Sequence, residues 1–158
     1  MKTRTNPGAQ RAFTLIELML ILLVMATLAT LALPVYQGYI DRARVSQAIR
    51  DIAEISMALE RHRTVNGTYP DSLADLGGGL PARDPWGRAY QYLAIEVDPP
   101  PAPGKVRRDK NMNPLNTDFD LYSMGPDGQT QKQLTAAKAR DDIVRAGNGG
   151  FIGKAEDH

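Results

Sequence analysis

The sequence RAFTLIELML, residues 11–20, opens the apolar run that decides the fold, and it places one carboxylate inside that run. From Phe13 to Leu33 the only ionisable side chain is Glu17. Some twenty residues at about 1.5 Å each can cross a hydrocarbon layer of about 30 Å, so the run predicts a transmembrane helix. A charge at the centre of such a helix costs about 2.5 to 3.5 kcal/mol, and less near one end, which indicates that Glu17 has a function beyond anchoring.

The twelve residues before this run are basic, with Lys2, Arg4 and Arg11, as at the start of a secretory signal peptide. Three observations disfavour an ordinary cleaved signal. The apolar run is longer than the usual signal core, Glu17 interrupts it, and no Ala-x-Ala site follows it. The run is therefore expected to stay in the protein as an anchor.

The motif AFTLIE, residues 12–17, resembles the type III signal of type IV pilins and type II secretion pseudopilins. The resemblance implies that a prepilin peptidase cuts between Ala12 and Phe13 and then methylates the amino group of Phe13. The family usually has Gly before the cut, so Ala12 departs from its pattern. The resemblance also implies that Glu17 guides assembly by pairing with the amine of a neighbouring subunit. The alternative is a single-span anchor that tolerates this carboxylate.

A long helix in two parts is expected after the leader. Pro34 follows the apolar run, and a kink is predicted there because proline removes a helical hydrogen bond. Apolar residues then recur at three- and four-residue intervals, which is typical of an amphipathic helix: Val45, Ala48, Ile49, Ile52, Ile55 and Leu59. Asn66-Gly67 is predicted to end this helix, because glycine accepts the left-handed backbone conformation. The predicted segments are a leader, 1–12, a transmembrane or fibre-core helix, 13–34, and an amphipathic helix, 35–66.

The remainder, residues 67–158, is expected to form a loop and sheet domain. One helical turn is predicted at residues 72–76, and strands are predicted at RAYQYLAI, residues 88–95, and DFDLYSMG, residues 118–125. The proline-rich segment 97–116 is predicted to be an exposed loop, and residues 151–158 give no clear signal. These elements predict an α+β fold in which the long helix packs on a small antiparallel sheet.

Three segments of this domain resemble the major pseudopilin of type II secretion: Tyr69-Pro70, DPWG at residues 84–87, and FDLYSMGPDG at residues 119–128. The resemblance implies a type IV pilin-like fold with a single span in a bacterial inner membrane and the carboxy-terminal domain in the periplasm. The aromatic residues Trp86, Tyr90 and Tyr92 are expected to pack in the core against the helix.

The composition and motifs of the chain give little support for catalysis or for nucleic-acid binding. The formal net charge is +1, which gives no reason for bulk attraction to nucleic acid. His62 and His158 belong to no nucleophile constellation, and no phosphate-binding glycine motif occurs. The basic cluster at residues 107–110 is expected to be solvated.

A calcium site is predicted in an acidic loop. The chain has no cysteine, so a small exported domain would need another staple. Asp127 in a Pro-Asp-Gly turn and the pair Asp141-Asp142 could converge if the intervening loop closes, and calcium takes six to eight oxygen ligands. The resemblance implies Asp127, Asp141 and Asp142 as side-chain ligands, with the backbone carbonyls of Met124 and Gln129. The alternative is a set of surface carboxylates in a turn.

The function implied by the resemblance is structural. The chain would self-assemble into a helical pseudopilus together with minor pseudopilins, after processing by the prepilin peptidase, on an assembly platform of the inner membrane, and fibre growth would drive protein export. A surface type IV pilin or competence pilin is the alternative within the same family, which the absence of cysteine disfavours. A monomeric anchored module that binds a partner through its proline-rich loop is the alternative from a different class.

Overall fold

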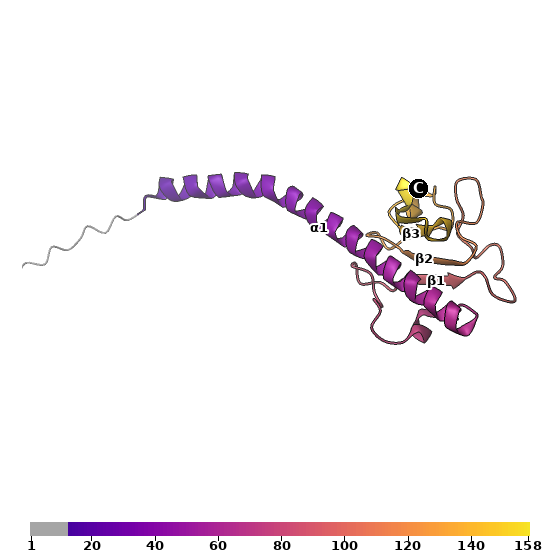
Figure 1. Ribbon diagram of the computed structural model, residues 1–158. Helices are drawn as coiled ribbons and strands as arrows, with labels where there is room; N and C mark the ends of the chain where they lie inside the picture. The colour runs from indigo at the N-terminus through magenta and orange to yellow at the C-terminus, as the bar shows by residue number, and fades with distance from the viewer. Residues whose placement is uncertain (1–12) are drawn as a thin grey trace, which may run out of the picture. The chain divides into compact units, whose positions relative to one another are not determined.

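The computed structural model describes residues 13–158, so the predicted leader and Ala12 lie outside the described residues. Its principal elements are α1 (Leu15–Asn66), β1 (Gln91–Ala94), β2 (Phe119–Ser123), β3 (Ile143–Ala146) and β4 (Phe151–Lys154) (Figure 1). The chain divides into two compact units, Met1–Ile40 and Asp41–His158, and the boundary falls within α1.

The first unit contains the apolar part of α1. An 18-residue window of this helix has a mean hydropathy of 2.5, and none of that window is buried. By length and composition this helix can cross a membrane, as predicted. Pro34 lies inside α1 and the helix continues through it, so the kink stays a prediction.

The second part of α1 supplies one apolar stripe to the second unit. The predicted positions Ala48, Ile52, Ile55 and Leu59 are all buried. The helix ends at Asn66, and the next residue, a glycine with φ of 82°, donates a backbone hydrogen bond of 2.7 Å to the carbonyl of residue 63. Both the amphipathic helix and its stop are confirmed.

The four strands form one antiparallel sheet in the order β1-β2-β3-β4. The two predicted strands are confirmed in their central residues as β1 and β2. The sequence did not predict β3 and β4. All four residues of β3 are buried, and so it lacks the alternation of apolar and polar residues by which a half-buried strand is recognised.

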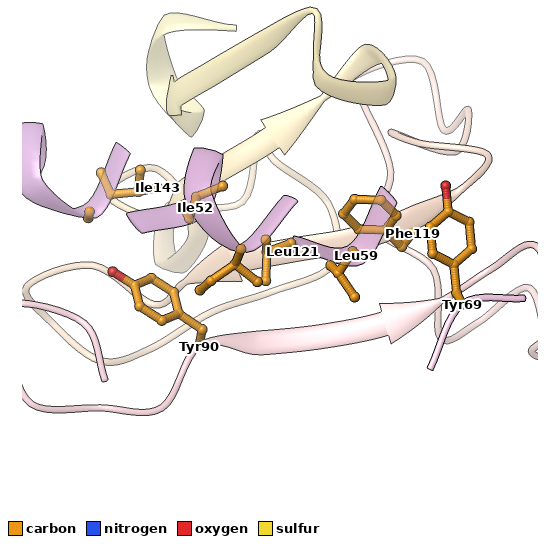
Figure 2. Close-up of a cluster of buried hydrophobic side chains, with 9 residues drawn as sticks. Ile52, Leu59, Tyr69, Tyr90, Phe119, Leu121 and Ile143 are labelled. Atoms are coloured by element: carbon orange, nitrogen blue, oxygen red, sulfur yellow. The ribbon is translucent and has the colours of Figure 1, made fainter. Parts of the chain in front are cut away.

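The main core lies between the second part of α1 and one face of the sheet. Figure 2 shows Ile52 and Leu59 of α1 packed with Phe119 and Leu121 of β2. Residues of β2 alternate between the faces, so 119 and 121 share the helix side. The core also contains Tyr69, Tyr90 and Ile143, while Trp86 and Tyr92 are partly buried against it. The prediction that the aromatic residues pack in the core is confirmed.

The opposite face of the sheet is covered by loops. Val144 and Ala146 of β3 pack there with Leu115 and Leu134. The prediction that residues 97–116 form an exposed loop is therefore wrong at Val106, Arg107, Leu115 and Asn116, which are buried. β3 has apolar side chains on both faces, Ile143 on one and Val144 with Ala146 on the other, so the sheet needs a second cover. Leu115 of this segment contributes to that cover despite the polar composition around it.

Candidate assembly helix and acidic loop

Glu17 lies in the first turn of α1. Its backbone N–H donates to the Oγ1 of Thr14 at 3.2 Å, an arrangement that caps the start of the helix. A carboxylate in the first turn also gains about 0.3 to 1 kcal/mol from the helix dipole. This gain is smaller than the cost of a charge in a membrane, so local helix stability does not account for Glu17.

The apolar side chains around Glu17 have no cover among residues 13–158. Leu15, Ile16 and Leu18 are 76%, 73% and 51% exposed, and large exposed hydrophobic residues continue as far as Tyr39. Within the same residues no ion pair involves Glu17. Such a long continuous apolar surface marks a membrane or protein interface.

The acidic loop brings the backbone of Asp127 to the carboxylate of Asp141. The backbone N–H of Asp127 donates to Oδ2 of Asp141 at 3.1 Å, and the N–H of Gln129 donates to Oδ1 of Asp127 at 2.7 Å. Gly125 has φ of 61°, and a Cβ there would collide with the backbone carbonyl of Asp141. Gly125 and Asp127 thus lie directly against Asp141.

Asp142 is buried and faces a different partner. Its Oδ2 accepts hydrogen bonds from Nη2 of Arg107 at 2.7 Å and from Oγ1 of Thr130 at 2.6 Å. Its Oδ1 is buried and has no hydrogen-bond partner. Burial raises the pKa of Asp142 to about 6, although Thr130 and Arg107 act in the opposite direction. The alternative of surface carboxylates does not describe Asp142.

The oxygen chemistry of this loop fits calcium in part. Asp142 presents a buried carboxylate oxygen without a partner, and the adjacent Asp141 is also acidic. Among residues 13–158, however, no three acidic or histidine side chains stand close enough together to hold a metal. The calcium ligands, including the carbonyls of Met124 and Gln129, stay a prediction.

Arg107 is the functional residue that sequence reasoning missed. It was expected to be solvated, but it is only 2% exposed, and its guanidinium carbon lies 4.0 Å from the centroid of the Tyr122 ring. Its backbone N–H donates to Oδ2 of Asp120 at 2.7 Å. A cluster of basic residues in a loop gives no signal of this burial, because the partner Asp142 is distant in the sequence.

A second buried arginine, Arg145, forms an ion pair inside the second unit. Arg145 of β3 donates from Nη2 to Oδ2 of Asp118 at 2.6 Å, and its guanidinium carbon lies 3.9 Å from the centroid of the Phe119 ring. Oε1 of Glu60 lies 3.9 Å from the same Nη2. This network connects the sheet to α1 and serves the fold.

The chain is similar to several known proteins over most of its length. It is 31% identical to the type II secretion system core protein G of Pseudomonas aeruginosa, over 76% of this chain and 86% of that protein. It is 30% identical to the protein of the same name from Pectobacterium carotovorum, over 75% of this chain and 78% of that protein. The type IV major pilin protein PilE1 of Neisseria gonorrhoeae is 29% identical, over 87% and 78%.

No family model matches the chain, and no solved structure gives a significant match. The named relatives are secretion and pilin proteins, which is consistent with a protein that is not an enzyme. The long apolar helix followed by a small antiparallel sheet is the type IV pilin-like fold that the sequence predicted. The chain belongs to the family of type II secretion system core protein G, the major pseudopilins.

Proposed function

We propose that this chain is a structural subunit of a helical pseudopilus, which assembles from a bacterial inner membrane and drives protein export by type II secretion. One observation carries the proposal. The apolar part of α1 is uncovered within the described residues and contains an unpaired Glu17, while the unit from residue 41 onward buries a core of its own. A helix of this kind supports burial against a membrane first and against neighbouring subunits afterwards.

The energetics of Glu17 support assembly over anchoring. An anchor alone gains nothing from a carboxylate that costs about 2.5 to 3.5 kcal/mol when central in the membrane. An opposite charge from a neighbouring subunit would convert this unpaired charge into a paired one. Cleavage before Phe13 would create that charge as a new amino group, four residues from Glu17 in the sequence.

The proposal includes the steps around assembly. The prepilin peptidase would cut between Ala12 and Phe13 and methylate Phe13, and the unit from residue 41 would lie in the periplasm. Minor pseudopilins and an inner-membrane platform would be the partners of the growing fibre. Pro34 would let the helix bend or locally unwind where subunits pack, because proline cannot donate a helical hydrogen bond.

We also propose that calcium binds the acidic loop through Asp127, Asp141 and Asp142, with carbonyl oxygens of Met124 and Gln129. The buried Oδ1 of Asp142, which has no hydrogen-bond partner, supports this. When bound, calcium would supply positive charge that offsets the repulsion between adjacent carboxylates.

A surface type IV pilin is the second candidate, and the relative from Neisseria gonorrhoeae favours it. The two candidates differ in where the fibre is found. Fibres that remain in the periplasm support the pseudopilus, and fibres on the cell surface at native expression support the pilin.

The experiment that tests the proposal replaces Glu17 with Leu. Glu17→Leu should enter the membrane at least as well as the parent, because a costly charge is removed. Fibre yield and secretion should fall to background. Met19→Leu is the matched control, since it changes the same exposed helix without changing its charge. Normal fibre yield and secretion in Glu17→Leu would contradict a role of Glu17 in assembly.

A further inference from the structure

Three segments of the chain meet at the carboxylate of Asp142. Arg107 comes from the proline-rich segment, Thr130 from the acidic loop, and Asp142 directly precedes β3. Nη1 of Arg107 donates to Oγ1 of Thr130 at 2.8 Å, and its Nη2 donates to Oδ2 of Asp142 at 2.7 Å. The hydroxyl of Thr130 donates onward to the same Oδ2 at 2.6 Å. One guanidinium therefore joins the acidic loop to the start of β3.

Arg107 is held in place from several sides. Its ring partner is Tyr122, and Asp120 of the same strand accepts its backbone N–H. The following residue, Arg108, is hydrogen-bonded by its N–H to the carbonyl of residue 132 at 2.8 Å, and its carbonyl accepts from the N–H of Leu134 at 3.1 Å. A guanidinium that is positioned in advance loses little entropy on pairing.

A second guanidinium contacts the other end of the loop. Nη2 of Arg88 donates to the backbone carbonyl of Gly125, and the same side chain lies against Gly128. The loop thus meets one arginine at its first turn and another at Asp142. The carbonyl of Gly125 and the carboxylate of Asp142 thus each accept a hydrogen bond from a guanidinium of the same chain.

We propose that Arg107 is a built-in counter-ion that keeps residues 126–142 closed without any metal. The guanidinium of Arg107 already pairs with Oδ2 of Asp142. Calcium could therefore bind only the remaining oxygen, Oδ1, and the loop would not need it to close. The inference does not depend on the proposed calcium site. It predicts that the loop is ordered in the parent protein even when divalent ions are removed.

The test is amide hydrogen exchange of residues 126–142 in the full chain in detergent, with chelator and with calcium. The variants are Arg107→Gln, which removes the charge, and Arg107→Lys, which keeps it without the planar fork. Arg108→Gln is the matched control, because the side chain of this half-buried neighbour donates to the carbonyl of Pro103 and not to Asp142. Peptides covering β1 and β2 report whether a variant is still folded.

In chelator the parent and Arg108→Gln should both keep the loop protected, and calcium should only slow its exchange further. Arg107→Gln should exchange there at least about tenfold faster, with β1 and β2 still protected, because a buried carboxylate has lost its partner. Arg107→Lys should lie between them. Calcium should restore protection in Arg107→Gln if it can replace the guanidinium. Protection that calcium fails to restore would contradict the calcium site and support Arg107 as the cation of this loop.

Two results would overturn the inference. One is a parent loop that loses its protection in chelator, which would show that a metal orders it, and this result needs no variant to fold. The other is an Arg107→Gln loop that stays protected in chelator, which would show that packing alone closes it.

Discussion

The two units of this chain contain similar apolar residues and use them in opposite ways. In the first unit Leu23 is 65% exposed, as are most large side chains around it. In the second unit Ile52 and Phe119 are fully buried. The second unit is stabilised by its own core, and the first must find its apolar partner in a membrane or in other subunits. Apolar composition alone therefore does not tell which kind of burial a segment has.

The charged residues follow the same division. Asp118 and Asp142 of the second unit are each paired with an arginine of the same chain. Glu17 of the first unit has no ion pair within residues 13–158. A charge satisfied within the chain serves the fold, whereas a charge without a partner there indicates an interaction with another molecule.

The largest expected effect concerns where the first unit begins. Protein isolated from membranes that contain the prepilin peptidase should lack residues 1–12 completely and carry one methyl group on Phe13. Intact-mass measurement checks both changes. Ala12→Gly should be processed at least as well as the parent, because glycine is usual at this position. A chain that retains Met1, or that begins after Leu33, would contradict the proposed processing.

The second effect separates the two kinds of apolar residue. Phe119→Ala should lower the free energy of unfolding of the second unit by about 3 to 5 kcal/mol, since it leaves a cavity in the core. Leu23→Ala, in the exposed part of α1, should leave that free energy unchanged. Denaturant titration of the full chain in detergent, followed by tryptophan fluorescence of the second unit, measures both. Equal losses in the two variants would show that the units are not independent.

The third effect is calcium-dependent and should be confined to the second unit. Calcium at about a hundredfold above its dissociation constant should raise the free energy of unfolding by about 2.7 kcal/mol. Thermal melting in calcium, magnesium and chelator checks this, with Asp127→Ala as the variant. Magnesium should substitute poorly because it requires tighter octahedral geometry. The same melting temperature for the parent in calcium and in chelator would contradict the proposed calcium site.

The smallest effect compares two tyrosines. The hydroxyl of Tyr90 donates to Oδ2 of Asp51 at 2.8 Å, and burial raises the pKa of Tyr90, which keeps the donor protonated. Tyr90→Phe should cost about 0.5 to 1.5 kcal/mol of stability. Tyr39→Phe is the control, since Tyr39 is 65% exposed. The same denaturant titration should register only the first change, and a cost at residue 39 would reveal an additional contact of the first unit.

Local patterns made part of the fold predictable. The apolar stripe from Ala48 to Leu59 follows the helical repeat, and a glycine at residue 67 ends the helix. Both features could be predicted because each depends only on residues that are close together in the sequence. β3 and β4 are as short as β1, but their sequences, IVRA and FIGK, lack the alternating tyrosines that marked β1. β3 pairs with the nearby β4 and also with β2, and this second pairing lies outside a local window of sequence.

The candidate sites show the same limit. Glu17 was recognisable because a charge in an apolar run is conspicuous. The convergence of the carboxylates of Asp127, Asp141 and Asp142 stays a prediction, because the contact present joins the backbone N–H of Asp127 to Asp141. The arginine partner of Asp142 was not expected. In the sequence Arg107 stands in a basic cluster of the kind that is usually solvated. Only the folding of the proline-rich segment over the sheet brings it to its carboxylate.

Imaging of fibres tests the central claim most directly. The full chain should be expressed in cells that contain a prepilin peptidase and an assembly platform, beside an established pseudopilin as positive control. The account predicts helical fibres that are built from chains beginning at methylated Phe13. Mature protein that stays dispersed in the membrane, in cells where the control pseudopilin forms fibres, would contradict it.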